Sequence, residues 1–459
     1  MTITVILGAQ WGDEGVSSSI GNQRENWLIS SRGRRNSVAE LPVDGVSYSF
    51  HLLPSGLMNP RCMNFIGSGV VFHMSKTDSV APSPTFFSEL KELEEKGLTA
   101  VHDRILVSDR VNVLLDMHMA VDGLEEKELG DEAIGTTKRG TVPSQLPTAL
   151  FPVCWVRAFT STPVNEAHRP MLPNKQSGKT LLGLMRASHC ALTFSQRTGI
   201  KLTDIFYPGS LEKKMRRLAD GYRKRFGELF TYDVEAELAR FEEYRETMGK
   251  YVVDGVSFMA SAQQSDSKIV IEGANALMLD VDYGSYPFVT SSNTTLAGVI
   301  GGLALNPKNI TETVGVVKAY TTRVGWGAFK TEDTEEGRRP AAGADVDGEL
   351  SSLLLPINLL TVGRLDLVVV KYSNSINYYT SLNLTKELDS YPADLEILER
   401  AEVVYHEMPG WQKPTTNART WYDLPKKARD YVEYIEQFVG VKIKYVGTGP
   451  EREAMIQRA

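Results

Sequence analysis

Two adjacent carboxylates, Asp13 and Glu14, lie in a glycine-rich turn near the start of the chain. The turn follows residues 3–9, a continuous β-branched run that predicts a buried strand. Gly12 and Gly15 flank the acids and would let backbone N–H groups approach a phosphate, while an acidic side chain there could hold Mg²⁺. The same pattern is common in ordinary turns after strands. It therefore indicates a phosphate or metal site without establishing one.

A second group of polar side chains follows a strand-like run at residues 268–273. Asn275 comes just after this run, and Thr290 lies in a polar segment further along the chain. Ligands of α/β proteins gather at the carboxyl ends of parallel strands. We therefore expect Asn275 and Thr290 to face the same cavity as Asp13.

Two further turns place hydroxyl groups beside glycine, at residues 135–137 and 447–450. Such groups can donate to phosphate oxygens, or can cap a helix. A structural turn is the commoner explanation for residues 447–450. Neither segment predicts a ligand by itself.

The overall composition is that of a globular protein. The chain has 459 residues, of which 42% are hydrophobic and 23% charged, and its formal net charge is -7. This balance argues against a nucleic-acid partner held by a broad basic face. A local site for a small anion is still allowed, because it needs only a few cations.

Location and redox state follow from what the sequence lacks. Cys62, Cys154 and Cys190 fit no CxxC metal pair and suggest no disulfide framework, which favours a reducing compartment. The N-terminus has neither the charged nor the apolar region of a signal peptide. No apolar run approaches the length of a membrane span. We expect a cytoplasmic protein with no membrane partner.

The predicted elements alternate between strands and helices. Strands are predicted at residues 3–9, 268–273 and 365–371. Helices are predicted at 84–97, twice within 209–250, and at 425–437. An apolar stripe is expected along Leu218, Tyr222, Phe226, Leu229 and Phe230, with the many charges of 209–250 on solvated faces. This alternation predicts an α/β fold, with a large, mostly parallel central sheet flanked by helices and small subdomains.

Several blocks fit no such pattern. Residues 16–41, 74–84, 141–195 and 344–362 have no clear periodicity and are expected to be irregular or poorly packed. Structureless loops this long are unusual inside a compact domain. We treat residues 1–459 as a single domain interrupted by these blocks.

Taken together, long strings of this chain resemble one family, adenylosuccinate synthetase. The strings are VILGAQWGDEG (5–15), VDGVSYSFHLLPSGLMNP (43–60), IGTTKRG (134–140), IEGANALMLDVDYGSYPFVTSSNT (271–294), VVKAYTTRVG (316–325), LDLVVVKYS and YTSLNLTK within 365–386, and much of 403–453. The resemblance implies a ligase that joins IMP and L-aspartate to form adenylosuccinate while hydrolysing GTP, with Mg²⁺ as cofactor.

The resemblance also implies roles for individual residues. Asp13 matches the base that removes the N1 proton of IMP and also binds Mg²⁺. The residues matched to the IMP side are Asp13, Glu14, Thr137, Arg197, Asn275 and Thr290. Arg197 matches an arginine that reaches the neighbouring subunit's IMP, which implies a homodimer. The residues matched to the GTP side are Gly12, Gly15, Lys386, Gly447, Thr448 and Gly449.

The sequence departs from the family pattern in places. The family's first loop reads GDEGKGK, but Val16, Ser17 and Ser18 follow Gly15 here, and the first 50 residues contain no histidine. The family's arginine-rich loop is reduced to Arg364. An alternative is therefore a catalytically impaired relative, or the product of a mis-annotated gene, that binds IMP or dimerises without turnover. A generic P-loop GTPase is excluded, because no G-x-x-x-x-G-K-[ST] occurs.

Overall fold

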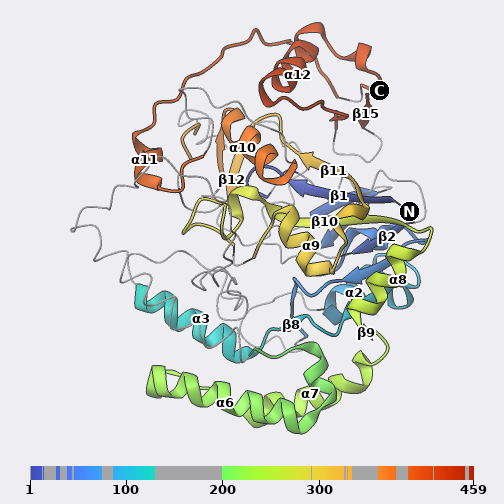
Figure 1. Cartoon of the computed structure of the whole chain (residues 1–459), viewed down its shortest axis with the longest axis vertical. Helices are drawn as coiled ribbons and strands as arrows, with labels where there is room; N and C mark the ends of the chain where they lie inside the picture. The colour runs from blue at the N-terminus through green and yellow to red at the C-terminus, as the bar shows by residue number, and fades with distance from the viewer. Residues whose placement is uncertain are drawn as a thin grey trace, which may run out of the picture.

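A seven-stranded parallel sheet forms the centre of the protein (Figure 1). The computed structural model describes residues 2–12, 14, 27–30, 39–43, 46–74, 86–129, 199–290, 292–324, 327, 329–332, 360–378, 391–416, 418–449 and 454–458. The strands, in spatial order, are β11 (Ile310–Val316), β1 (Thr2–Gly8), β10 (Lys268–Ala276), β2 (Trp27–Ser30), β5 (Met63–Ile66), β7 (Ile105–Ser108) and β9 (Val252–Val253). Because every neighbouring pair is parallel, all carboxyl ends lie along one edge.

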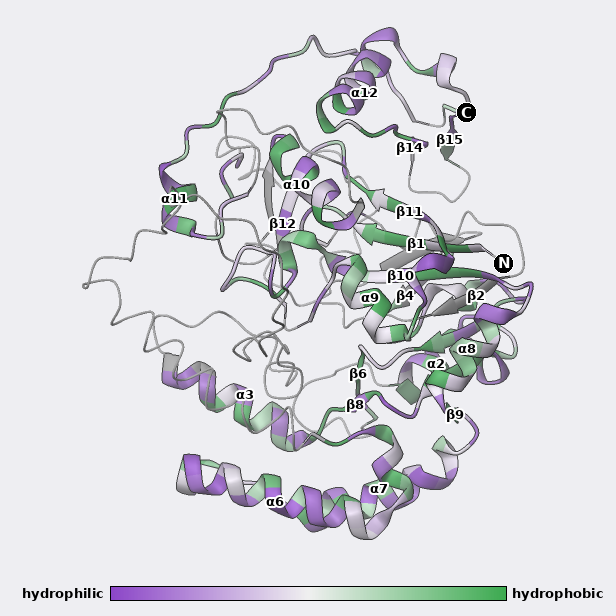
Figure 2. Ribbon diagram, viewed as in Figure 1, coloured by the Kyte–Doolittle hydropathy of each residue, from purple (hydrophilic) through white to green (hydrophobic). Residues whose placement is uncertain are grey.

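The central strands are apolar because helices or loops cover both faces. Ile3, Val5 and Leu7 of β1 pack in one cluster with residues of α8 (Gly255–Gln264) and α9 (Leu296–Leu303). Ile6 faces the other side and packs with Val270 of β10. Figure 2 shows the hydrophobic colouring concentrated on β1, β10 and α9. This is the layered arrangement expected of a parallel sheet.

A second and larger core lies beyond the β7 side of the sheet. It includes residues of β4 (Val46–Phe50), which pairs with β3 (Ala39–Val43), of the pair β6 (Val71–Phe72) and β8 (Asn112–Val113), and of the helices α2 (Phe86–Glu95), α3 (Asp116–Leu129), α6 (Pro208–Phe226) and α7 (Val234–Met248). Buried Glu89 of α2 ties this region together by accepting the N–H groups of His51, Leu52 and Leu53. Figure 1 shows α3, α6 and α7 grouped at one end of the molecule.

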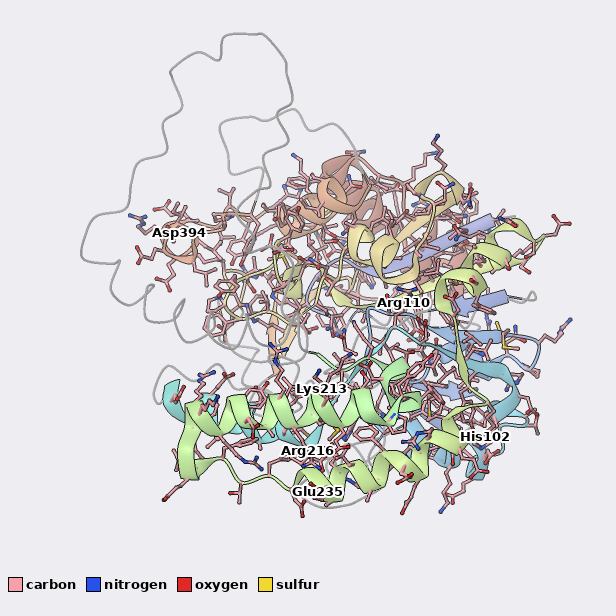
Figure 3. The ribbon with its side chains drawn as sticks, turned by 60° about the horizontal axis from the view of Figure 1, so that its bottom comes forward. His102, Arg110, Lys213, Arg216, Glu235 and Asp394 are labelled. Atoms are coloured by element: carbon pink, nitrogen blue, oxygen red, sulfur yellow. The ribbon has the colours of Figure 1, made fainter. Side chains whose placement is uncertain are left out.

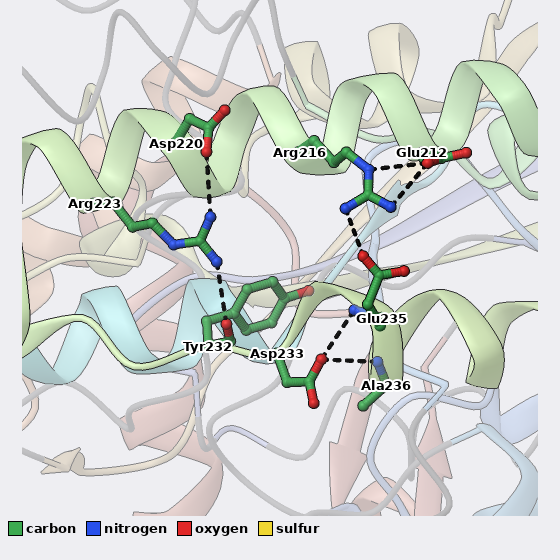
Figure 4. Close-up of polar contacts among 8 residues, drawn as sticks. All are labelled: Glu212, Arg216, Asp220, Arg223, Tyr232, Asp233, Glu235 and Ala236. Atoms are coloured by element: carbon green, nitrogen blue, oxygen red, sulfur yellow. Dashed lines mark hydrogen bonds and ion pairs between the residues drawn. The ribbon is translucent and has the colours of Figure 1, made fainter.

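The charges on α6 and α7 lie on solvated faces, as expected. Arg216 bridges Glu212 on its own helix and Glu235 on α7, and all three side chains are exposed (Figures 3 and 4). Exposed pairs of this kind add little stability. The predicted apolar stripe is buried at Leu218, Tyr222, Phe226 and Phe230. The prediction is wrong for Leu229, whose side chain is 73% exposed. A short 3-10 helix follows α6 at this point and changes the direction in which the side chains face.

The C-terminal third adds smaller elements. These are the antiparallel pairs β12 (Thr321–Val324) with β13 (Leu360–Gly363) and β14 (Tyr445–Gly447) with β15 (Met455–Gln457), and the helices α10 (Leu367–Tyr378), α11 (Leu395–Arg400) and α12 (Lys426–Val439). Short 3-10 helices occur at Ser55–Met58, Val101–Arg104, Leu202–Phe206, Gly227–Leu229, Leu277–Leu279, Pro307–Asn309 and Trp421–Asp423. In the described part of the chain, no helix combines the length and apolar character needed to cross a membrane.

The predicted fold class is confirmed, as are the strands at 3–9 and 268–273 and the helices within 209–250. The predicted strand at 365–371 is wrong, because α10 begins at Leu367. The Asp366 carboxylate accepts the Val369 N–H at 3.1 Å and so caps a helix. A short apolar run fits a buried helix as well as a strand, and periodicity alone cannot separate them.

The blocks expected to be irregular are partly regular. Trp27–Ser30 pairs with β10 inside the central sheet, and Leu360–Gly363 pairs with β12. Ala39–Val43, at the end of the first block, forms a hairpin with β4. The expectation of irregular structure is therefore wrong for these segments. Residues 75–84 and 141–195 lie outside the described residues.

Candidate active site

The candidate site begins where β1 and β10 end side by side. Gly8 pairs with Ala276 across the two parallel strands. A Cβ added at Gly8 would lie 2.6 Å from the Asn275 carbonyl oxygen and 2.8 Å from Glu14 Oε2. No real Cβ contact to a backbone atom is that short, so only glycine fits. The carboxyl end of β1 therefore lies in close contact with the backbone of Asn275.

The loop after β1 folds back on itself. Gly12 has φ +98°, a conformation that favours glycine, and a Cβ there would lie 3.3 Å from the Asn275 Cα. The Gly12 N–H donates to the Glu14 carboxylate, at 3.0 Å to Oε1 and 3.1 Å to Oε2. Glu14 is buried. Its carboxylate therefore holds the backbone of the loop at Gly12 from the protein interior.

Asn275 occupies an unusual backbone conformation at the end of β10. Its φ is +54°, in the left-handed region, and its side chain is buried. Asparagine tolerates this region better than most residues. The strand thus ends in a sharp change of direction beside Gly12. The structure brings Gly12, Glu14 and Asn275 together.

Thr290 is attached to the same edge by backbone contacts. Its N–H donates to the Leu279 carbonyl at 2.8 Å, and the Leu279 side chain is the nearest neighbour of a Cβ placed at Gly12. Thr290 is half-buried. Asn275 and Thr290 therefore both lie beside the loop after β1. That they face one cavity with Asp13 stays a prediction, because Asp13 lies outside the described residues.

The loop that carries Thr290 is organised by Asp280, which the sequence did not single out. This fully buried carboxylate accepts the N–H groups of Asp282 and Tyr283 through Oδ1, and those of Thr294 and Thr295 through Oδ2. Burial raises the pKa of Asp280, while the N–H donors oppose the change. One side chain thus closes the loop at both of its ends. Its position inside the matched segment was the only available signal.

Gln10 joins three of the loops at this edge. Its backbone carbonyl accepts the Met278 N–H at 3.0 Å, its Oε1 accepts the Lys318 N–H at 2.8 Å, and its Nε2 donates to Thr321 Oγ1 at 3.5 Å. Its side chain is 1% exposed. These partners follow β10 and β11, so Gln10 fixes both segments relative to the loop after β1. No pattern in the sequence pointed to Gln10, because its partners are far away along the chain.

A buried cation lies behind the same loop. Arg323 of β12 is 2% exposed, and its guanidinium carbon lies 6.0 Å from the centre of the Trp11 ring. The Phe329 ring also meets Trp11 edge-on, with 5.4 Å between the ring centres. Burial lowers the pKa of Arg323 to about 10, so it is still charged at neutral pH. The cation and the aromatic rings fix Trp11, which directly precedes Gly12.

The predicted turn at Gly447, Thr448 and Gly449 belongs to a separate C-terminal unit. Gly447 ends β14, and the Thr448 hydroxyl donates to the Ala418 carbonyl at 2.9 Å. The Thr448 N–H donates to the Ala454 carbonyl at 2.8 Å. The turn that follows β11 contacts this unit through Tyr431 and the loop after β1 through Gln10. The two predicted groups of residues therefore lie on different parts of the fold.

The other predicted site residues lie outside the described residues: Asp13, Gly15, Thr137, Arg197 and Lys386. Within the described ranges, no group of three or more His, Cys, Asp and Glu side chains is arranged to hold a metal ion. The assignment of a metal to Asp13 therefore stays a prediction.

The chain is similar to known proteins along its whole length. A family model described as adenylosuccinate synthetase matches residues 5–146, 164–390 and 386–456. The adenylosuccinate synthetase of Fusarium vanettenii is 59% identical over 100% of both chains, and that of Pyricularia oryzae is 48% identical over 99% of this chain and 100% of the relative. A structure of fully ligated adenylosuccinate synthetase from Plasmodium falciparum has a TM-score of 0.76 and 29% identity, with 100% of both chains covered.

None of these three proteins is named as an impaired or non-catalytic relative. The similarity covers both the sheet edge that carries Gly12 and Asn275 and the C-terminal unit that carries Gly447. The chain therefore belongs to the adenylosuccinate synthetase family.

Proposed function

We propose that this protein joins IMP and L-aspartate to form adenylosuccinate, with hydrolysis of GTP. The observation that carries the proposal is the meeting of Gly12, Glu14 and Asn275 at the carboxyl ends of β1 and β10, in a chain 59% identical to a named synthetase. A glycine loop beside polar side chains at this edge suits a phosphorylated ligand.

The reaction needs an activated purine oxygen. Asp13 is proposed to remove the N1 proton of IMP, which makes the O6 atom nucleophilic toward the γ-phosphoryl group of GTP. The Gly12 N–H to Glu14 contact would hold the loop in which Asp13 lies. Displacement of phosphate at C6 by the aspartate amine then gives the product. Asn275, Thr290 and Thr137 would orient IMP during both steps.

The GTP side of the site is assigned to two regions. Gly12 and Gly15 would face the phosphates, whereas Lys386, Gly447, Thr448 and Gly449 would face the guanine base. When bound, Mg²⁺ would offset charge on the transferring phosphoryl group. Asp13 is its proposed ligand.

Arg197 is proposed to reach the IMP of a second copy of the chain, so the active form would be a homodimer. We further propose that the protein works in the cytoplasm and that residues 1–459 form one domain. A matched pair of variants tests the dimer. Mixing Asp13→Asn and Arg197→Leu chains, each inactive alone, should restore some activity if sites are shared between subunits. No recovery in dimers shown to exchange subunits would contradict the shared site.

Purified protein assayed for adenylosuccinate with IMP, GTP and L-aspartate tests the reaction. We expect product that depends on all three substrates and is lost in Asp13→Asn, because the base is removed. Calorimetry with IMP alone separates binding from turnover. IMP binding without product would instead favour the catalytically impaired alternative, and neither binding nor product would reject the proposed function.

A further inference from the structure

A short turn after β11 touches both parts of the site. The turn runs from Lys318 to Thr321, between β11 and β12. On one side, Gln10 accepts the Lys318 N–H at 2.8 Å and donates to Thr321 Oγ1 at 3.5 Å. Ala9 reinforces this side by donating its N–H to the Val316 carbonyl at 3.0 Å. The turn is therefore attached directly to the segment that leads into Gly12.

The other side of the turn is held by α12. The Tyr431 hydroxyl donates to the Ala319 carbonyl at 2.6 Å. Burial raises the pKa of Tyr431 to about 12, so the hydroxyl keeps its proton throughout the neutral range. Helix α12 leads within a few residues into β14 and Gly447. A second link is the ion pair between Lys444 and Glu312 at 2.7 Å. Lys444 directly precedes β14, and Glu312 belongs to β11.

The C-terminal unit has its own small core, and its helix α12 also lies against α10, where the Lys371 ammonium is 5.5 Å from the centre of the Phe438 ring. Ala418, Leu424, Ala428 and Ile456 form that core, with Trp411 and Trp421 packed against it. The Lys444–Glu312 pair is exposed, and pairs of that kind hold geometry weakly. The short Tyr431 hydrogen bond to a backbone carbonyl is therefore the sharper polar constraint of the two.

We propose that residues 318–321 form a joint that sets the position of the base-side loop, Gly447–Gly449, relative to the phosphate-side loop at Gly12. Gln10 and Tyr431 are the positioning residues at its two ends. This inference rests on the proposed function, because it takes GTP to be the molecule that spans both loops. A nucleotide held at both ends needs those ends at a fixed separation, and a loose joint would lose binding and alignment together.

The sharpest variant is Tyr431→Phe, which removes one hydroxyl and keeps the ring. We expect the affinity for a non-hydrolysable GTP analogue to fall by roughly three- to tenfold, the usual effect of one lost hydrogen bond. The affinity for IMP should not change, because the proposed IMP contacts Asn275 and Thr290 do not belong to the C-terminal unit that Tyr431 attaches. Tyr422→Phe is the matched control, since Tyr422 belongs to the same unit but is 83% exposed. Calorimetry measures all three proteins.

Gln10→Met tests the other end of the joint. If both residues act through one turn, the double variant should lose less GTP-analogue affinity than the sum of the single losses. Additive losses would mean that the two contacts act independently, which would overturn the proposal. A general loss of packing would lower IMP affinity as well, so the comparison between IMP and the GTP analogue separates positioning from damage.

Hydrogen exchange without any nucleotide tests the joint itself. Tyr431→Phe should speed exchange of the amides at residues 318–324 as well as in α12, whereas Tyr422→Phe should not. Unchanged exchange at residues 318–324 would overturn the joint even if the protein makes adenylosuccinate. Conversely, a wild-type chain that binds no GTP analogue would reject the proposed function, whatever the exchange experiment gives.

Discussion

Asn275 combines a backbone constraint and a proposed ligand contact at one position. Its φ of +54° directs the chain away from β10, and the resulting close approach leaves room only for glycine at Gly8. Few residue types tolerate the left-handed region, and asparagine is one that also offers a polar side chain. The choice of residue therefore satisfies local geometry and proposed function together.

Replacing Asn275 separates these two roles. Asn275→Gly and Asn275→Ala both remove the carboxamide, so both should weaken IMP binding by a similar factor in calorimetry. Alanine is strained in the left-handed region, so Asn275→Ala should be less stable than Asn275→Gly by roughly 0.5–1 kcal/mol. Urea unfolding measures this difference. Equal stabilities would show that backbone strain at this position is negligible.

At the scale of elements, two strands and one loop build the site edge. Strands β1 and β10 approach so closely that Gly8 meets the Asn275 carbonyl. The loop after β10 is closed by Asp280, which binds backbone N–H groups at both ends of the loop. Thr290 in the same loop is held through its N–H, which donates to the Leu279 carbonyl beside Asp280. The elements therefore position side chains through their backbones.

Gly8→Ala tests the strand contact. The new methyl group would lie 2.6 Å from a backbone oxygen, so we expect a loss of about 1–3 kcal/mol in the free energy of unfolding. The matched control is Gly123→Ala in α3, where a Cβ would meet nothing within 4 Å. It should gain roughly 0.5–1 kcal/mol from helix propensity. A neutral Gly8→Ala variant would contradict the proposed close contact.

Asp280→Asn tests the loop. The new amide group would place a donor against backbone donors that now meet a carboxylate oxygen, so we expect a loss on the order of 2 kcal/mol. Asp282→Asn is the control, because the Asp282 carboxylate only accepts an exposed bond from Asn293 at 2.7 Å. It should change stability by less than about 0.5 kcal/mol. Chemical unfolding checks both, and a reversed order would refute the role given to Asp280.

At the scale of the whole molecule, one buried carboxyl group joins two helices far from the site. Glu237 of α7 accepts the Asp116 N–H at the start of α3 at 3.0 Å and also contacts the Tyr232 hydroxyl. Arg240 pairs with Asp116 at 2.5 Å. Burial, and secondarily the nearby Asp116 charge, raise the pKa of Glu237 to about 8. The group is therefore neutral in the folded protein at pH values where the unfolded chain carries a charge.

This difference makes stability depend on pH. Between about pH 4.5 and 8 the folded state holds a proton that the unfolded state has released, so rising pH lowers stability. One such group contributes up to about 1.4 kcal/mol per pH unit. Glu237→Gln cannot ionise and should lack this decline. Unfolding curves of both proteins at pH 5.5 and 7.5 test it, and parallel changes would exclude Glu237 as the source.

The sequence alone determined the strands at residues 3–9 and 268–273, because continuous β-branched runs bounded by glycine have few other solutions. With the resemblance, it also predicted that Gly12, Asn275 and Thr290 belong to one site. Both results depend on local pattern or on long matched strings, which need no knowledge of distant contacts.

The tertiary structure alone decided the rest. Gln10 and Asp280 looked like ordinary polar residues until their backbone partners were placed, and the partners of Gln10 lie more than 250 residues away. The apolar run at 365–371 fits a strand or a helix by its pattern, and in the folded chain it is a helix from Leu367 whose Val369 packs in one cluster with Trp11 and Met278. Hydrogen bonds between distant segments depend on how the chain folds, and residue type and spacing along the sequence do not encode them separately.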